Sequence, residues 1–221
     1  MFSKYFCSME SIRRVLMISD SLALPRLTPE KVGYTETYYA KLIDSFKEIA
    51  FLQLFIGGAT LPFLVQKSGY YASFNPDLVV VQSGVVDCAF RAFGEVELKI
   101  LGKLRIRVPK RLLPFLRRVR KKRYTSPDHF RRNIQLLQKR FGKERVYWIA
   151  IMPASKEWEN KVPGIMKSVE KYNGILQEEV GQNIIGSDAM LQHVMSDFHH
   201  MNSEGHAYIF EEVQRIVKQY R

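Results

Sequence analysis

Residues 13–26, Arg13-Arg14-Val15-Leu16-Met17-Ile18-Ser19-Asp20-Ser21-Leu22-Ala23-Leu24-Pro25-Arg26, decide the fold. Residues 15–18 are apolar, partly branched and too few for a helix, which predicts a buried strand. We expect Ser21 to emerge at the carboxyl end of that strand, where open α/β sheets carry their chemistry. Ser21 is therefore a candidate nucleophile. An ordinary helix N-cap is the alternative, because Ser and Asp are both favoured there.

The rest of the chain alternates between apolar runs and helical patterns. Further strands are predicted at 49–56, 76–84 and 146–152, with a weaker one at 183–185. Helices are predicted at 35–46, capped by Thr35, and at 61–68, 126–142, 164–180 and 203–220. The strands run apolar without alternation, as parallel strands covered on both faces do. We expect one three-layer α/β/α domain over residues 1–221, a doubly wound parallel sheet with a basic insertion or lid at about 95–125.

Composition indicates a folded globule, since 46% of the residues are hydrophobic. No apolar run approaches the roughly 20 residues that a membrane-spanning helix needs. Residues 1–14 lack the apolar core of a signal peptide, so a cytoplasmic protein is expected. The two cysteines, Cys7 and Cys88, predict neither a disulfide framework nor a cysteine zinc site.

The net charge of +12 belongs to one segment. Lys99 to Arg145 holds 18 Lys and Arg against two acidic residues, and the remainder is mildly acidic. Pro109 and Pro114 prevent one continuous helix there. Apolar residues under a cationic rim suit an anionic membrane surface, such as the inner membrane face, or an acidic polymer; a solvated charged loop is the alternative. Nucleic acid is not expected, because few aromatic residues are available for base stacking.

A second group of polar residues lies near the C-terminus, in Ser196-Asp197-Phe198-His199-His200. A serine hydroxyl needs a base to take its proton, and a carboxylate orients that base. Asp197, three residues before His200, meets this requirement. A metal cluster of His199, His200 and His206 is the alternative, but neighbouring histidines do not readily share one ion and no recognised ligand spacing is complete. We expect no metal and no cofactor.

Four short motifs together carry a family resemblance: Asp20-Ser21-Leu22, Gly57-Gly58, Gly84-x-x-Asp87 and Asp197-x-x-His200. Their order and spacing over nearly the whole chain resemble the SGNH, or GDSL, hydrolase superfamily, which implies a flavodoxin-like fold. Residues 20–26 and 84–89 more narrowly resemble a bacterial branch found with polysaccharide and lipopolysaccharide biosynthesis.

The resemblance implies roles for these residues. Ser21 would be the nucleophile, His200 the general base and Asp197 the group that orients it. The oxyanion donors would be the amide of Ser21 and that of Gly57 or Gly58.

Two positions depart from the family pattern. Ser19 replaces the first family glycine, and Val86 stands where the family has an oxyanion asparagine. Loss of one such donor typically costs about 2.7 to 4 kcal/mol of transition-state stabilisation.

The substrate site is expected to include Asp20, Gly84 and Asp87, with Arg91 and Arg26 following the strand ends. One of the two arginines would bind an anionic substrate group or replace the missing donor. The alternative for each is a surface arginine in a loop. His199 and His206 are expected to be structural, with His206 packed at the start of the last helix.

The implied function is an esterase or deacetylase that removes an acyl group, with O-acetyl expected, from a carbohydrate or glycoconjugate. Acyl transfer to a polysaccharide or lipid-linked sugar through the same intermediate is one alternative. A non-catalytic glycan-, membrane- or nucleic-acid-binding protein, with Val86 marking lost activity, is another.

Overall fold

The computed structural model describes residues 13–220; the N-terminal residues, Cys7 among them, lie outside this range. Its centre is a five-stranded sheet in the order β2-β1-β3-β4-β5, and all paired strands are parallel. The strands are β1 (Arg14–Ser19), β2 (Ala50–Phe55), β3 (Leu78–Gln82), β4 (Val146–Ile149) and β5 (Ile184–Ile185). The predicted doubly wound parallel sheet is confirmed.

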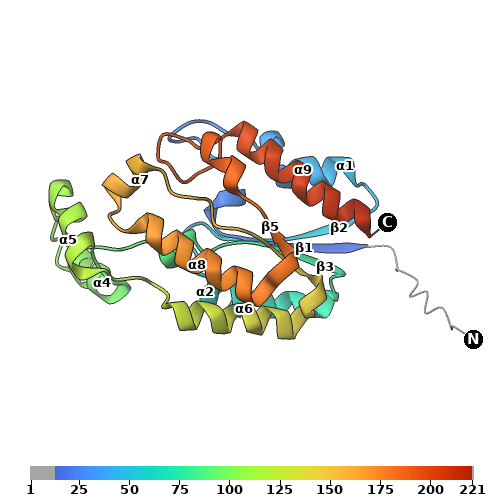
Figure 1. Ribbon diagram of the computed structural model, residues 1–221, viewed down its shortest axis with the longest axis horizontal. Helices are drawn as coiled ribbons and strands as arrows, with labels where there is room; N and C mark the ends of the chain where they lie inside the picture. Colours follow the sequence, from blue (N-terminus) through green and yellow to red (C-terminus); the bar gives the residue numbers. More distant parts are fainter. Residues whose placement is uncertain (1–12, 221) are drawn as a thin grey trace, which may run out of the picture.

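Helices cover both faces of this sheet (Figure 1). One face carries α1 (Tyr38–Ser45) and α9 (Ser203–Gln219), and the other carries α2 (Leu61–Ser68), α6 (Pro127–Phe141) and α8 (Ile165–Val180). Two apolar clusters fill the two interfaces, and the strands β1 and β3 contribute to both because their side chains alternate between the faces. This explains why these two strands are apolar throughout.

Three details of the predicted elements are wrong. Strand β2 is an edge strand in which only Leu54 is buried, because one side of it has no neighbouring strand. The N-cap of α1 is Thr37, whose hydroxyl accepts from the Ala40 N–H, and not Thr35. Strand β4 ends at Ile149, since the Asn173 side chain binds both the N–H and the C=O of Ile151 at 2.8 and 2.6 Å.

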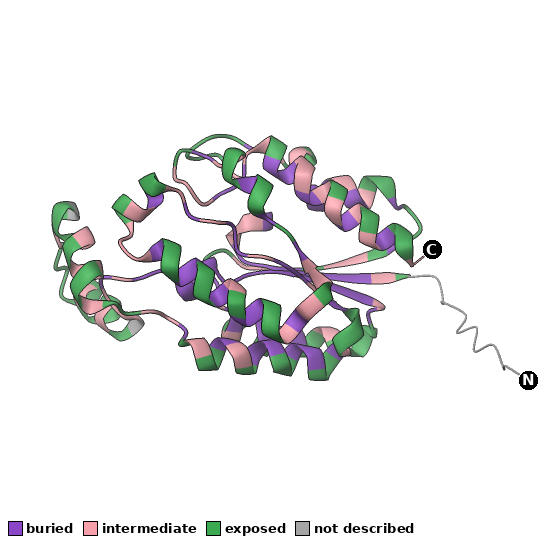
Figure 2. Cartoon of the chain, in the orientation of Figure 1, coloured by how far each residue is buried: buried purple, intermediate pink, exposed green. Residues whose placement is uncertain are grey.

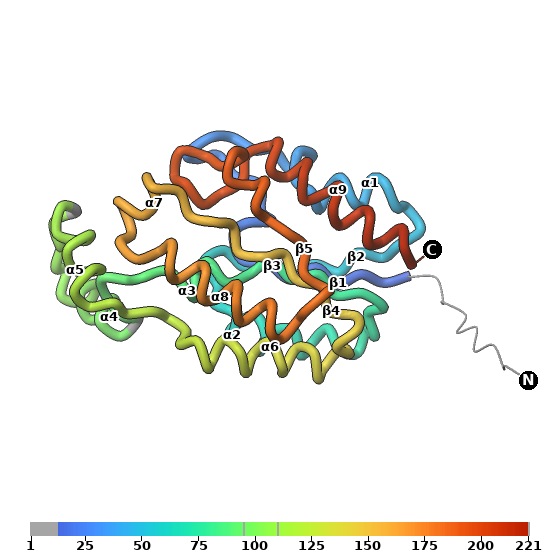
Figure 3. Tube along the Cα trace, viewed as in Figure 1, coloured from blue at the N-terminus to red at the C-terminus, as the bar shows by residue number. Residues whose placement is uncertain are grey.

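Residues 95–123, which we call the cationic hairpin, leave the body of the domain at the carboxyl end of the sheet (Figures 1 and 3). They form α4 (Glu95–Lys103) and α5 (Leu113–Arg120), with the two prolines between and at the start of the helices as expected. None of the side chains described in this segment is buried (Figure 2). An antiparallel bridge between Arg91 and Lys122, with the Arg91 N–H donating to the Lys122 carbonyl at 2.8 Å, closes its base.

Two short helices complete the carboxyl end of the sheet. Helix α3 (Val85–Cys88) follows β3 directly, and α7 (Lys156–Lys161) follows β4. Within residues 13–220, no helix combines the length and apolar character needed to cross a bilayer.

Candidate active site

Ser21 lies two residues beyond Ser19, the last residue of β1, at the start of the 3-10 turn η1 (Ser21–Ala23). The N-cap of this turn is Asp20, whose Oδ1 accepts from the Leu22 N–H at 2.9 Å. The alternative interpretation of Ser21 as an N-cap is therefore wrong, and the Ser21 hydroxyl is available for another partner.

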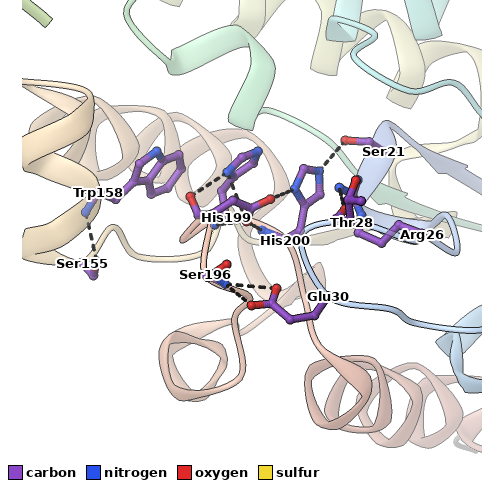
Figure 4. Close-up of polar contacts among 10 residues, drawn as sticks. Ser21, Arg26, Thr28, Glu30, Ser155, Trp158, Ser196, His199 and His200 are labelled. Atoms are coloured by element: carbon purple, nitrogen blue, oxygen red, sulfur yellow. Dashed lines mark hydrogen bonds and ion pairs between the residues drawn. The ribbon is translucent and has the colours of Figure 1, made fainter. Parts of the chain in front are cut away.

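That partner is His200, which arrives from the loop before α9 (Figure 4). Ser21 Oγ lies 3.0 Å from His200 Nε2. On the other side of the ring, His200 Nδ1 lies 2.6 Å from Asp197 Oδ2. The His200 N–H also donates to Asp197 Oδ1 at 3.0 Å, so one carboxylate fixes both the backbone and the ring. The three residues form a continuous hydrogen-bonded line.

The two loops that carry this line are tied to each other. The Glu30 carboxylate, from the loop after Ser21, accepts the Ser196 N–H at 3.1 and 3.2 Å (Figure 4). The histidine loop is also closed on itself, because the Met195 N–H donates to the His200 carbonyl at 2.8 Å. These contacts keep the serine and histidine sides in register.

Burial sets the protonation of the pair. Burial, reinforced by the neighbouring His199, lowers the pKa of His200 to about 4, although Asp197 acts in the opposite direction. Burial acts to raise the pKa of Asp197, but hydrogen bonds from the His200 ring and backbone outweigh it and lower this pKa to about 2. At neutral pH the site thus holds an ionised carboxylate and a neutral imidazole, the state in which His200 accepts a proton.

The glycine pair follows β2 and forms a tight turn beside Ser21. The Ala59 N–H donates to the Ile56 carbonyl at 3.1 Å, and Gly58 adopts φ +71°, a conformation that favours glycine. A Cβ added to Gly57 would lie 4.0 Å from the Ser21 Cβ. Among the hydrogen bonds of residues 13–220, none has the amide of Ser21, Gly57 or Gly58 as donor, so all three remain available to a ligand.

A pocket of about 420 Å³ opens from Ser21 and Gly58 toward the cationic hairpin. Its walls are apolar and aromatic, with two arginines: Val85, Val86, Ala89, Phe90, Arg91, Arg117, Tyr124, Trp158, Val162 and His199. The Trp158 and His199 rings stack with centroids 5.6 Å apart. His199 thus lies in the pocket wall.

The pocket residues that sequence reasoning missed include Arg117, Tyr124 and Trp158. Arg117 and Trp158 come from the separate helices α5 and α7 and meet only through the tertiary fold. The dense charge around Arg117 was a signal, but nothing in it distinguished this arginine from its neighbours.

Three residues expected in the substrate site have structural places instead. Asp20 is fully buried under Ser21 as the cap of η1. Asp87 is fully buried as well; it accepts the Leu61 N–H at 3.0 and 3.1 Å and the Thr125 hydroxyl, and so holds the start of α2. Gly84 adopts φ +133°, and a Cβ there would lie 2.6 Å from Ile151 Cδ1. These residues shape the site without lining the pocket.

The two expected arginines differ in position. Arg91 lines the pocket, whereas Arg26 does not. Arg26 bridges to Val32, and its guanidinium donates to the Thr28 carbonyl at 3.3 Å (Figure 4). The charge of Arg26 still affects the site. It acts to lower the pKa of His200, although less than burial and His199 do.

Three groups come close enough to share a metal ion: Asp197, His199 and His200, with ligand atoms within 4.8 Å of one another. The hydrogen bonds of Asp197 to His200, and of His200 to Ser21, use the atoms that an ion would need. His206 lies elsewhere, buried at the start of α9 as expected, with Nδ1 accepting from the Tyr38 N–H at 3.4 Å. The cluster of three histidines is therefore not formed.

Comparison with models of known protein families finds no match, and comparison with curated proteins finds none. Solved structures do match over nearly the whole chain. A lipase/acylhydrolase from Enterococcus faecalis has a TM-score of 0.67 at 17% identity, covering 94% of this chain and 96% of that one. A GDSL-like lipase from Bacteroides thetaiotaomicron has a TM-score of 0.62 at 13% identity, covering 95% and 89%.

An acetylxylan esterase from Geobacillus stearothermophilus, solved as a catalytic mutant, has a TM-score of 0.61 at 14% identity and covers 94% of both chains. These similarities agree with the motif resemblance noted in the sequence. The chain has the fold of the SGNH/GDSL lipases and esterases.

Proposed function

We propose that this protein is a serine ester hydrolase that removes a short acyl group, O-acetyl in the first instance, from a carbohydrate or glycoconjugate. The observation that carries the proposal is the line from Ser21 through His200 to Asp197, with 3.0 Å and 2.6 Å between its hydrogen-bonded atoms. A hydroxyl, a neutral imidazole and a carboxylate in this order are the parts needed for nucleophilic acyl transfer.

The geometry supports the following reaction. Ser21 Oγ attacks the ester carbonyl carbon while His200 Nε2 takes the hydroxyl proton, and Asp197 stabilises the resulting imidazolium. The amides of Ser21 and of Gly57 or Gly58 receive the negative oxygen of the tetrahedral intermediate. When the intermediate collapses, His200 gives its proton to the leaving alcohol. Water then attacks the acyl-enzyme, His200 takes the water proton and returns it to Ser21, and the carboxylic acid leaves.

Two observations bear on the substrate. The described pocket, of about 420 Å³, has room for a short acyl group together with part of an alcohol, and two arginines stand among its apolar walls. One solved structure with this fold is an acetylxylan esterase. Val86, at the wall of the pocket, brings no side-chain donor, so the backbone amides carry the oxyanion and a modest turnover rate is expected.

The test is active-site labelling. A fluorophosphonate probe should react with the wild type at Ser21, as located by peptide mass spectrometry, and Ser21→Ala should not react. Ser196→Ala, which removes a nearby hydroxyl outside the site, is the matched control and should label normally. Turnover of 4-nitrophenyl acetate should follow the same pattern.

Failure of the wild type to label, or equal labelling of Ser21→Ala, would overturn the proposal and favour a binding protein on the same fold. Product analysis with an added sugar acceptor separates hydrolysis from acyl transfer: acetate release shows hydrolysis, and an acetylated acceptor shows transfer.

A further inference from the structure

Two arginines in the pocket have no carboxylate partner. Arg91 and Arg117 both line the space that opens from Ser21. Among the ion pairs of residues 13–220, neither occurs, although Arg120 of the same hairpin pairs with Glu97. Among the described residues, those that line the pocket include no acidic side chain.

The guanidinium groups are held in place by uncharged groups. Arg91 lies over the Tyr124 ring at 4.9 Å and donates weakly to the Val86 carbonyl at 3.4 Å. Arg117 donates to the Lys161 carbonyl at 2.8 Å, which ties α5 to the end of α7. The Nε of each is buried and lacks a hydrogen-bond partner. Both side chains therefore retain donors for a ligand.

The two charges also lie close enough to repel. Burial, and then the charge of Arg91, lower the pKa of Arg117. The charge of Arg91 acts on the Asp87 carboxylate, but the Asp87 oxygens already bind the Leu61 N–H and the Thr125 hydroxyl. An anion placed between the guanidinium groups would relieve this repulsion and accept several charge-assisted hydrogen bonds.

We infer that Arg91 and Arg117 bind a carboxylate, phosphate or sulfate group of the substrate, so that the preferred substrate is an acidic ester. This inference rests on the proposed ester hydrolysis. It assigns to the cationic hairpin a specific task, because Arg117 is the hairpin residue that reaches the pocket.

The experiment compares matched esters in the full-length protein. One arm uses acetylated glucuronic acid against acetylated glucose, and acetylated glucose 6-phosphate extends it to phosphate. A second arm uses 4-nitrophenyl hemisuccinate against 4-nitrophenyl butyrate, which places the charge on the acyl side. In at least one of the two arms, the acidic ester should have a higher kcat/KM than its neutral counterpart. Arg91→Ala or Arg117→Ala should lower the ratio of the two kcat/KM values about tenfold or more.

Arg118→Ala, an exposed arginine on the same helix, is the matched control and should keep the preference. Arg117→Lys should retain part of it, since a charge remains without the guanidinium fork. An unchanged ratio of acidic to neutral ester in both arginine variants, with Ser21 still labelled, would overturn this inference and leave the hydrolase intact.

A direct binding measurement separates the two proposals. Trp158 lines the pocket, so inorganic phosphate should change tryptophan fluorescence in a saturable way in the wild type and in Ser21→Ala. Arg117→Ala should lose this response and Arg118→Ala should keep it. Saturable binding without Ser21 labelling would mean that the anion site exists and the hydrolase proposal fails. Absence of a response from the wild type would count against the anion site.

A different observation supports a second proposal about the outer surface of the hairpin. Sixteen large apolar side chains are exposed in the described chain, and eight of them lie in the hairpin: Val96, Leu98, Ile100, Leu104, Ile106, Leu112, Phe115 and Val119. Leu112, Phe115 and Val119 recur at the spacing of one helical face. Twelve Lys and Arg and two acidic residues share the same segment.

We propose that the hairpin binds an anionic membrane surface, with its apolar side chains among the acyl chains and its cations at the headgroups. Its charge matches an anionic surface and disfavours a second copy of the same hairpin. The hairpin lies at the carboxyl end of the sheet (Figure 1), so binding there would bring the pocket to the membrane.

Vesicle co-sedimentation tests this proposal. The wild type should bind phosphatidylcholine vesicles only when they contain phosphatidylglycerol. Phe115→Ser combined with Val119→Ser, which leaves the charge unchanged, should weaken binding about tenfold or more. Leu136→Ser, at an exposed apolar position on α6, is the matched control. Equal binding by the double variant, or full displacement from vesicles by soluble polyglutamate or duplex DNA, would overturn membrane insertion and indicate an acidic polymer instead.

Discussion

At the scale of single residues, the site is governed by how deeply its ionisable groups are buried. His200 is buried beside an ionised Asp197, and Asp20 lies fully buried directly under the serine. Burial keeps the His200 imidazole neutral against the opposing effect of Asp197, and burial keeps the Asp20 carboxyl group protonated over much of the acid range. Two measurements of pH dependence follow from these environments.

The first concerns the acid side of the activity profile. His200 accepts a proton only when neutral, so activity falls as the pH drops through its pKa, which burial lowers to about 4. We expect kcat/KM for 4-nitrophenyl acetate, followed by pH-stat titration, to remain high well below 6.5, the ordinary value for histidine. Asp197→Asn should reduce kcat about 10²-fold or more, because the ring loses its orienting carboxylate. If the fall of kcat/KM on the acid side had its midpoint at pH 6.5 or above, this would contradict the effect of burial on His200.

The second concerns stability. Burial is the largest factor that raises the pKa of Asp20 to about 7, so the folded state holds this proton more tightly than the unfolded state does. The contribution of Asp20 to stability is therefore present at low pH and is lost as the pH rises between the unfolded and folded pKa values.

Asp20→Asn keeps an oxygen for the Leu22 N–H but does not titrate. We expect the Tm of Asp20→Asn relative to the wild type to increase by about 4 °C or more between pH 4 and pH 8. Differential scanning calorimetry measures this, with Asp44→Asn, a fully exposed site, as control. A constant difference would contradict the buried-proton assignment.

These residue-scale features were unequally visible in the sequence. The relation of Asp197 to His200 depends on three residues of local chain, so spacing alone predicted it. The positions of Asp87 and Asp20 beneath the pocket depend on which atoms cap α2 and η1, and a motif does not contain that information. Arg117 lay beyond prediction because its place in the pocket depends on α5 being tied to the end of α7 in the tertiary fold.

At the scale of elements, the site depends on how β3 passes into α3. Gly84 makes this turn at φ +133°, packed against Ile151 and Phe130. The sequence predicted the strand and the glycine, since four successive apolar residues before Gly84 leave few alternatives. It did not predict that β2 would be an edge strand. An edge strand that other segments partly cover can be as rich in apolar residues as an interior strand, so composition does not distinguish the two.

Two glycine substitutions test the turn. Gly84→Ala should lower the free energy of unfolding by about 2–4 kcal/mol, because the new Cβ meets Ile151 and the backbone conformation disfavours a side chain. Gly174→Ala, inside α8 with no atom within 4 Å of the added Cβ, is the control and should be stabilising by about 0.5–1 kcal/mol. Urea denaturation gives both values. A neutral Gly84→Ala would show that the turn relaxes easily.

At the scale of the whole molecule, we expect the domain to fold without the cationic hairpin. None of the described side chains of the hairpin belongs to either apolar cluster, and an antiparallel bridge between Arg91 and Lys122 closes its base. The sequence predicted an insertion at this point from its charge and prolines. Only the fold shows that one side of the hairpin completes the pocket while the other side stays exposed.

Excision of the hairpin tests this separation. Replacement of residues 93–120 by a short Gly-Ser linker should change the Tm by less than about 4 °C, since both clusters remain complete. Fluorophosphonate labelling of Ser21 should persist, while vesicle binding and the preference for acidic esters should disappear together. Loss of cooperative unfolding in the calorimeter would show that the hairpin is part of the folding unit.

The partners Ser21 and His200 are separated by 179 residues of chain. During synthesis, the serine and all five strands are complete before the histidine has been translated. A ribosome-bound chain therefore carries the proposed nucleophile for most of its synthesis without the base that activates it. Appearance of ester hydrolysis in a stalled-chain series should accordingly mark the point at which the loop before α9 leaves the exit tunnel, which makes the reaction itself a reporter of the moment when His200 reaches Ser21.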